Sequence, residues 1–341
     1  MTIHSHAKLP HLMATGAVLA LVALAAPAAA DAGPGKAGGV RAELDNGTLN
    51  VEGGNRANAV SLRLKSGDPN QIQVDAGDNG SSEFNFARGD VRAISVAMGN
   101  GRDSVRIDDV NGTFTDTIPT TISGGNGNDS LNGGQGAETL RGGNGDDSVD
   151  GGKGNDTALL GRGNDSFRWD PGEGSDVIEG QSGLDTMVFN GANAPTVENV
   201  TMSANGGRLT FHREPANITM DTDDVEIVDF NAIGGLDTVT VNDLTGTDVI
   251  QTNLDLAGAL GGDAPDGADD SVVVNGTDGD DNIQIAGNGS GADVTGLATA
   301  VSITHADPTD ELSVDTRAGA DNVLAAGVAG VLQVLVDGST V

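Results

Sequence analysis

Residues 124–165 read GGNGNDSLNGGQGAETLRGGNGDDSVDGGKGNDTALLGRGND, and a carboxylate recurs at every ninth position of this stretch. Glycine surrounds each acid, although glycine loses more backbone freedom on folding than any other residue. Like charges at a fixed interval also repel each other once a chain becomes compact. We therefore expect a component outside the sequence that offsets both penalties.

The repeated unit is Gly-x-acid-x-apolar, and it continues without a break from residue 127 to residue 187. Its acids are Asp129, Glu138, Asp147, Asp156, Asp165, Asp176 and Asp185. The apolar partners are Leu131, Leu140, Val149, Ala158, Phe167, Ile178 and Met187. Each unit has too few residues for a crossover helix. Two units, about 18 residues, are predicted to form one coil that stacks on the next at ~4.8 Å, with the apolar residues inside.

The flanks of the repeats contain short runs of alternating polarity, such as AISVAM (93–98), DTVTVND (237–243) and NIQIAG (282–287). Val, Ile and Thr at a period of two indicate strands with one buried face. The sequence thus predicts an all-β fold, a parallel β-roll or β-solenoid with irregular β-helical flanks. Its expected regions are an N-terminal irregular β region (31–122), the β-roll (123–190) and a C-terminal irregular β-solenoid region (191–341).

Residues 1–30 are typical of a secretory signal peptide that is cut before Asp31. MTIHSHAKLPH precedes the apolar run LMATGAVLALVALAAPAAA, which ends in three alanines. A membrane anchor is the alternative, but Thr15, Gly16 and Pro27 interrupt the run and no second apolar segment follows. The sequence therefore predicts a secreted, extracellular protein without membrane insertion.

The composition restricts the partners of the chain. With 50 acidic and 17 basic residues, the net charge of −33 disfavours nucleic acids and anionic membranes, whose phosphates repel it. The absence of cysteine excludes disulfides and thiolate metal sites. Only His212 and His305 follow the predicted cleavage point, so zinc and copper fit poorly.

Stacked coils would place acids from alternate units in one row. Two carboxylates ~5 Å apart repel by about 3 kcal/mol at an effective dielectric constant near 20. A hard divalent cation between successive turns would remove this repulsion, and glycine-rich turns direct backbone carbonyls toward one point. Ca²⁺ accepts six to eight oxygen ligands in adaptable geometry, whereas Mg²⁺ demands a tight octahedron and retains water. Calcium is therefore the expected cofactor.

The unit GGNGNDSLN (124–132) and its successors resemble the hemolysin-type calcium-binding nonapeptides of the RTX family, Gly-Gly-x-Gly-x-Asp-x-apolar-x. The stretch FRWDPGEGSDVIEGQSGLDTMVFNGANA (167–194) is similar to the segment that often follows such repeats in secreted bacterial calcium-binding proteins. The specific motif covers residues 123–190, roughly a fifth of the chain. This resemblance implies a parallel β-roll that holds calcium between its turns.

The resemblance also implies the ligands. The side-chain ligands are expected to be Asp129, Asp147, Asp156 and Asp165. The backbone ligands are expected to come from Gly125, Asn126, Gly127, Gly134, Gly136, Gly143, Asn144, Gly145, Gly152, Gly154 and Gly163. We expect two or three good sites.

Several positions depart from the family pattern. The extra methylene of Glu138 is expected to move its carboxylate outward and leave its site weak or empty. Leu160 replaces the first glycine of its unit, and Ala158 is expected to leave the interior underfilled. Asp176 and Asp185 follow an 11-residue step, which leaves their register open.

Other candidate residues receive plainer interpretations. The outlying acids Asp103, Asp237, Asp281 and Asp321 are interpreted as ordinary turn residues, because aspartate beside glycine is common in turns. Phe167 and Trp169 are expected to pack inside the solenoid.

The sequence predicts a protein without catalytic residues. It contains no H-E-x-x-H, G-x-S-x-G or P-loop motif and no EF-hand spacing. The leading hypothesis is a secreted calcium-binding protein in which calcium binding is coupled to folding. One alternative is a matrix, adhesion or cell-surface structural protein that contacts cell-wall or matrix glycans and uses calcium as a staple. The other is a carbohydrate-active β-helical enzyme, since paired carboxylates can cleave glycosidic bonds.

Overall fold

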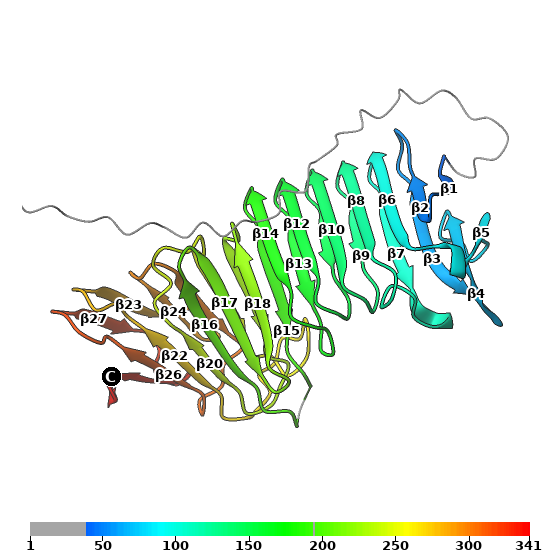
Figure 1. Ribbon diagram of the computed structural model, residues 1–341. Coiled ribbons are helices and arrows are strands. Elements are labelled where there is room, and N and C mark those ends of the chain that lie inside the picture. Colours follow the sequence, from blue (N-terminus) through cyan, green and yellow to red (C-terminus); the bar gives the residue numbers. More distant parts are fainter. Residues whose placement is uncertain (1–38, 194) are drawn as a thin grey trace, which may run out of the picture. The chain divides into compact units, whose positions relative to one another are not determined.

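The computed structural model describes residues 39–193 and 195–341, and strands dominate both ranges. They form two sheets, of 15 and 14 strands (Figure 1). The all-β prediction is therefore confirmed. The predicted signal peptide, residues 1–30, lies outside the described residues.

Each sheet has a defined strand order. The first sheet runs β1 (Arg41–Asp45), β2 (Thr48–Glu52), β6 (Ala93–Asn100), β8 (Thr120–Asn126), β10 (Glu138–Asn144), β12 (Thr157–Arg162), β14 (Val177–Ser182), β18 (Ile218–Asp223), β17 (Arg208–Glu214), β16 (Asn199–Asn205), β20 (Thr238–Val241), β22 (Ser271–Asn275), β26 (Glu311–Asp315), β28 (Gln333–Val336) and β29 (Ser339–Thr340). The second sheet runs β27 (Asn322–Ala326), β23 (Asn282–Gly287), β24 (Ala292–Thr295), β25 (Ala300–Thr304), β21 (Gln251–Asp255), β19 (Ile227–Asn231), β15 (Thr186–Asn190), β13 (Ser166–Trp169), β11 (Ser148–Asp150), β9 (Ser130–Asn132), β7 (Ser104–Asp108), β3 (Ala59–Lys65), β4 (Asp68–Ala76) and β5 (Phe84–Ala87). Two short 3-10 helices, η1 (Arg88–Asp90) and η2 (Asp109–Asn111), interrupt the strands.

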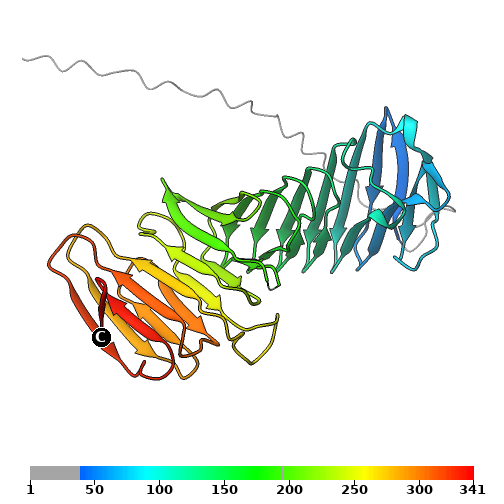
Figure 2. The ribbon, with the colours of Figure 1, turned by 90° about the horizontal axis from the view of Figure 1, so that it is seen from below.

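The chain in the repeats alternates between the two sheets. Leu140 pairs in parallel with Ala158 in the first sheet, and Val149 pairs with Phe167 in the second, each 18 residues on. The strands β8, β10, β12 and β14 lie side by side in Figure 1, and Figure 2 shows the strands of the repeats as a row. The predicted coil of two units is confirmed.

The 11-residue step does not disturb this register. Ala158 pairs with Ile178 and Phe167 with Met187, so both sheets continue with a separation of 20 residues. The extra residues belong to the turn at 170–173, where the Glu173 N–H donates to the Asp170 carbonyl at 3.2 Å. Asp176 and Asp185 therefore keep the register of the preceding acids, because the turn accommodates the two extra residues.

The apolar residue of each unit lies in the interior between the sheets. Leu131, Leu140, Val149, Ala158, Phe167, Ile178 and Met187 are all buried. Leu160, which replaces a glycine, is also fully buried. Leu160 adds apolar volume two residues along the same strand, and an underfilled interior at Ala158 itself stays a prediction.

Aromatic rings form the interior at the C-terminal end of the repeats. The rings of Trp169 and Phe189 stack with centroids 4.0 Å apart, and Phe211 lies 4.4 Å from Phe189. Phe230 completes the group at 6.1 Å from Phe189. Phe167 and Trp169 are fully buried, so their predicted packing role is confirmed.

The flanks interrupt the parallel ladders with antiparallel excursions. β3, β4 and β5 form one, β16, β17 and β18 a second, and β23, β24 and β25 a third. The parallel pairing nevertheless crosses the expected region boundaries, because β6 pairs with β8 and β15 with β19. In the described part of the chain, no helix combines the length and apolar character needed to span a bilayer.

Replacing Phe167 by Ala tests the packing of the interior. Phe167 is fully buried, so we expect Phe167→Ala to lower the free energy of unfolding by about 3–5 kcal/mol. The measurement is urea denaturation in saturating calcium. Leu184→Ala is the control, because Leu184 is 43% exposed and its loss should change stability by about 0.5 kcal/mol or less. Equal effects of the two substitutions would contradict the assigned interior.

Candidate metal centre

The turns that join the two sheets form two rows. The first turn row contains the turns 124–129, 142–147, 160–165 and 180–185, which lead from the first sheet to the second. The second turn row contains 133–138, 151–156 and 170–176, which lead back.

The predicted ligands are divided between these rows. The first turn row holds Gly125, Asn126, Gly127, Asp129, Gly143, Asn144, Gly145, Asp147, Gly163 and Asp165. The second turn row holds Gly134, Gly136, Gly152, Gly154 and Asp156.

The stacking of the turns requires glycine at defined positions. Gly143 and Gly145 have φ values of +120° and +122°. A Cβ on Gly143 would lie 2.1 Å from the Gly125 carbonyl oxygen, and one on Gly145 would lie 2.2 Å from that of Gly127. The carbonyls of each turn therefore lie directly against the backbone of the next turn. Glycine is needed beside the acids because a side chain there would collide with these carbonyls.

A ladder of hydrogen bonds connects the acids of the first turn row. The Asp129 N–H donates to Oδ1 of Asp147, and the Asp147 N–H donates to Oδ1 of Asp165, both at 2.7 Å. The Asp165 N–H donates to Oδ1 of Asp185 at 2.8 Å. Each aspartate thus holds the backbone of the preceding coil with one carboxylate oxygen.

The second turn row contains the same ladder. The Glu138 N–H donates to Oδ1 of Asp156 at 2.7 Å, and the Asp156 N–H donates to Oδ1 of Asp176 at 2.8 Å. Glu138 is only 2% exposed, and its Oε2 accepts the Gly134 N–H at 2.7 Å. The expectation that its carboxylate moves outward is wrong, because the longer side chain folds back onto its own turn.

The outlying acids also belong to ladders. We call each hydrogen bond from a backbone N–H to a carboxylate of the next coil a rung. Rungs join the Asn58 N–H to Asp103 (2.6 Å), the Glu198 N–H to Asp237 (2.8 Å) and the Asp281 N–H to Asp321 (2.9 Å). Their interpretation as ordinary turn residues is wrong for Asp103, Asp237 and Asp321, whose carboxylates accept an N–H from another coil. It holds for the side chain of Asp281, which accepts from Thr277 of its own turn. The signal that could have identified them is the spacing Gly-x-acid-x-apolar, present at 101–105 and 235–239.

The second oxygen of these carboxylates lacks a partner. Within residues 39–193 and 195–341, the buried acid oxygens without a hydrogen bond include Oδ2 of Asp103, Asp129, Asp147, Asp156, Asp165, Asp176, Asp185 and Asp237, and Oε1 of Glu138. An unpaired buried carboxylate oxygen is unfavourable, because it has lost its water without replacement. A row of such oxygens fits a hard cation, which binds oxygen ligands.

Backbone carbonyls add acceptors beside these oxygens. The Asn126 and Asn144 carbonyls accept the N–H groups of Gly101 and Gly127 at 2.8 and 2.7 Å, and a carbonyl oxygen has a second lone pair. The side chains of these asparagines form a separate ladder, in which Asn144 Nδ2 donates to Asn126 Oδ1 at 2.6 Å. The residues therefore offer carboxylate and carbonyl oxygens together, the donor set that calcium prefers.

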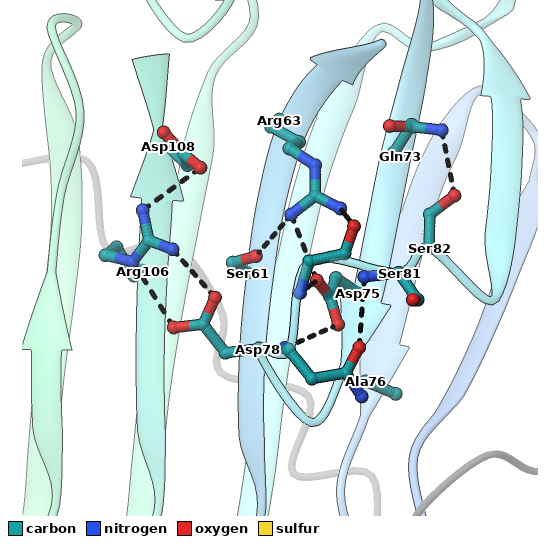
Figure 3. Close-up of polar contacts among 12 residues, drawn as sticks. Ser61, Arg63, Gln73, Asp75, Ala76, Asp78, Ser81, Ser82, Arg106 and Asp108 are labelled. Carbon is teal, nitrogen blue, oxygen red and sulfur yellow. Dashed lines mark hydrogen bonds and ion pairs between the residues drawn. The ribbon is translucent and has the colours of Figure 1, made fainter. Parts of the chain in front are cut away.

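Two acids near the N-terminal end of the sheets, the buried Asp75 and the exposed Asp78, have arginine partners (Figure 3). Asp75 is fully buried, and its Oδ2 accepts from Arg63 at 3.0 Å and from the Gly80 N–H at 2.7 Å. A hydrogen bond from Arg106 lowers the pKa of Asp78. By contrast, the described structure contains no ion pair to any repeat acid of the two turn rows.

Burial shifts the ionisation of the ladder acids in the absence of metal. It raises the pKa of Asp147 to about 7, opposed by the hydrogen bond from the Asp129 N–H and reinforced by repulsion from Asp165. Burial likewise raises the pKa of Asp156 to about 9 and that of Asp129 to about 6. Without a cation, burial in these turns therefore shifts the acids toward the protonated form.

Comparison with known proteins agrees with this geometry. Residues 121–137, 132–167 and 172–193 match the family model of the RTX calcium-binding nonapeptide repeat, in four copies. Comparison with curated proteins finds no match.

Gly145→Ala tests the stacking of the turns. We expect it to destabilise the protein by more than the ~1–2 kcal/mol of a left-handed alanine, because its Cβ would also collide with the Gly127 carbonyl. Gly206→Ala is the matched control, since Gly206 has a φ of +68° and open space around its missing Cβ. The free energy of unfolding in calcium measures both, and similar losses would exclude the predicted collision.

The raised pKa values predict a pH dependence of the metal-free protein. In chelator, the free energy of unfolding should fall as pH rises from about 4 to about 9. The folded chain binds more protons than the unfolded chain in this window, because the pKa of Asp147 rises from 3.8 to about 7 and that of Asp156 to about 9. The folded fraction at each pH in chelator, followed by far-UV circular dichroism, measures this. Asp147→Asn should flatten the profile, whereas Asp90→Asn at an exposed position should not; a flat wild-type profile would contradict the assignment.

Proposed function

We propose that this chain, which carries RTX calcium-binding nonapeptide repeats within residues 121–193, is a secreted protein whose fold is completed by calcium. The observation that carries the proposal is the row of buried carboxylate oxygens without partners, such as Oδ2 of Asp129, Asp147 and Asp165. These oxygens lie in the turns that the repeat family uses for calcium.

Ionised acids in the turn rows oppose assembly of the coils. Asp129, Asp147 and Asp165 occupy successive coils of one row, so their charges repel each other and lose water as the coils close. Bound calcium supplies positive charge and oxygen coordination between the turns. Because a ligand that binds only the folded state stabilises it in proportion to RT ln(1 + [L]/Kd), the folded fraction should follow the calcium concentration.

The proposed sites follow from the ladders. In the first turn row, Asp129 with Asp147 and Asp147 with Asp165 would hold calcium together with carbonyls of the glycine-rich turns. In the second turn row, Asp156 is the strongest proposed side-chain ligand. Glu138 is proposed as the weakest, because its carboxylate folds back to the Gly134 N–H of its own turn instead of accepting a backbone N–H of the preceding coil as the aspartates do. The regular repeats of 123–190 are proposed as the calcium-binding region, and 31–122 and 191–341 as β flanks that cover its ends.

Export is proposed from the sequence of residues 1–30. In a cytosol with little calcium, the repelling acids would keep the chain unfolded until it reaches a calcium-rich exterior. The RTX repeats are calcium-binding elements, and we propose a protein without catalytic activity. Contact with cell-wall or matrix glycans stays a prediction, which fractionation of the host followed by glycan pull-down tests.

A calcium titration followed by far-UV circular dichroism tests the coupling of binding to folding. Starting from chelator near pH 7.5, residues 31–341 should gain β signal cooperatively with Ca²⁺. Mg²⁺ should act weakly, because it demands octahedral geometry and retains its waters. Asp147→Asn should raise the calcium midpoint by about tenfold, equivalent to ~1.4 kcal/mol.

The control for this titration is Asp90→Asn, which removes the same charge at an exposed position and should leave the midpoint unchanged. A wild-type spectrum with full β signal in chelator, unchanged by calcium, would refute the proposed coupling. The two turn rows would then stand without metal.

A further inference from the structure

We propose a further calcium site at Asp237, outside the RTX repeats, in a third row of buried carboxylates. This C-terminal carboxylate row consists of Glu198, Asp237, Asp270 and Asp310. Each of its members directly precedes a strand of the first sheet, namely β16, β20, β22 and β26. The match to the repeat family ends at residue 193, before this row begins.

The C-terminal carboxylate row has the rungs of the repeats. The Glu198 N–H donates to Oδ1 of Asp237, and the Asp237 N–H donates to Oδ1 of Asp270, both at 2.8 Å. The Asp270 N–H donates to Oδ1 of Asp310 at 2.9 Å. The row therefore connects four successive coils, although these are separated by 33 to 40 residues instead of 18.

The turn before Asp237 also stacks as a repeat turn does. Gly235 has a φ of +144°, and a Cβ on it would lie 2.2 Å from the Thr196 carbonyl oxygen. The corresponding distance at Gly145 in the first turn row is also 2.2 Å. A carbonyl of the preceding turn is thus brought against the turn that carries Asp237, which is the arrangement seen between calcium-binding repeats.

Within the described residues, Asp237 is the member of its row that has a fully buried carboxylate oxygen without a hydrogen bond. Its side chain is 1% exposed, and Oδ2 has no hydrogen bond within the described residues. Glu198 instead pairs with Arg213 and accepts the Ala192 N–H, and Oδ2 of Asp310 accepts the Asp307 N–H. The unpaired oxygen therefore marks the space between Asp237 and the neighbouring acids of the row as the proposed position of the calcium ion.

The charge around this oxygen is only partly compensated, because Arg213, whose positive charge reaches Asp237, forms its ion pair with Glu198. Asp266 approaches the same turn and accepts the Gly235 N–H through Oδ2 at 2.8 Å. In the described ranges, no Lys, Arg or His forms an ion pair with Asp237, Asp266, Asp270 or Asp310. Carboxylates without a basic partner, together with backbone carbonyls, call for a hard divalent cation, and the adaptable coordination of Ca²⁺ fits best.

Asp281 shows that not every outlying acid meets these conditions. Its Oδ2 accepts the Thr277 N–H at 2.8 Å, and its Oδ1 accepts the Thr277 hydroxyl at 3.0 Å. Both oxygens are satisfied locally, so Asp281 closes its own turn. Asp281 is therefore excluded, and the proposal is made for Asp237, with Asp270 and Asp266 as the neighbouring carboxylates.

Counting bound calcium tests the site. Equilibrium dialysis of the full chain at millimolar free Ca²⁺, with metal measured by atomic emission, should give one calcium fewer per chain for Asp237→Asn than for wild type. The amide keeps an oxygen for the Glu198 N–H, so the fold should be retained, and circular dichroism in calcium checks it. Asp269→Asn is the matched control, because it removes the same charge at an exposed position beside Asp270 and should bind as wild type does. An unchanged count for Asp237→Asn would overturn the proposal.

A second measurement does not depend on the variant. Wild-type crystals grown with Tb³⁺ should show an anomalous peak within coordination distance of Oδ2 of Asp237, and peaks confined to residues 121–193 would overturn the site. These measurements distinguish a failure of the Asp237 site from a failure of the proposed function. If that function fails, the wild-type chain folds without calcium, yet Asp237→Asn still lowers the count; if only this site fails, Asp147→Asn lowers the count and Asp237→Asn does not.

Discussion

A buried carboxylate that accepts one backbone N–H from the preceding coil is the interaction on which the rest of this structure depends. The donor and the acceptor occupy the same position in adjacent coils, as at Asp129 and Asp147, so each rung sets the register and spacing of the next coil. The rung also brings the turns so close that a Cβ at Gly143 would collide with a carbonyl. The abundance of both glycine and aspartate follows from this one geometry.

Within the described residues, the same interaction leaves the second carboxylate oxygen of each repeat acid in the turn rows without a positively charged side chain as its partner. Outside the two turn rows, the buried acids Asp75 and Glu198 have arginine partners. Between stacked turns, where even a Cβ at Gly145 finds a carbonyl at 2.2 Å, a guanidinium and its stem do not fit. A small cation that binds oxygen satisfies the second carboxylate oxygen without requiring such space, which accords with the calcium-binding character of the repeats.

The ladders persist where the sequence repeat has disappeared. Rungs join residues 18 apart in the repeats, but 45 apart between Asn58 and Asp103 and 39 apart between Glu198 and Asp237. The antiparallel excursions, such as β3 to β5 and β16 to β18, account for the additional residues. The contact between coils is therefore a property of the fold, whereas the nine-residue period belongs only to coils without insertions.

The sequence by itself determined the features that depend on local spacing. The nine-residue period predicts two sheets, places Leu131 and Val149 inside, and assigns Asp129 and Asp147 to one row, because a strand alternates its side chains and a turn needs specific residues. Only the tertiary structure decided that Glu138 folds inward, that Leu160 is buried two residues from Ala158, and that Asp103 and Asp237 are buried rungs. The physical reason is that burial and pairing depend on what the neighbouring coil presents, and that coil lies 18 to 45 residues away along the chain.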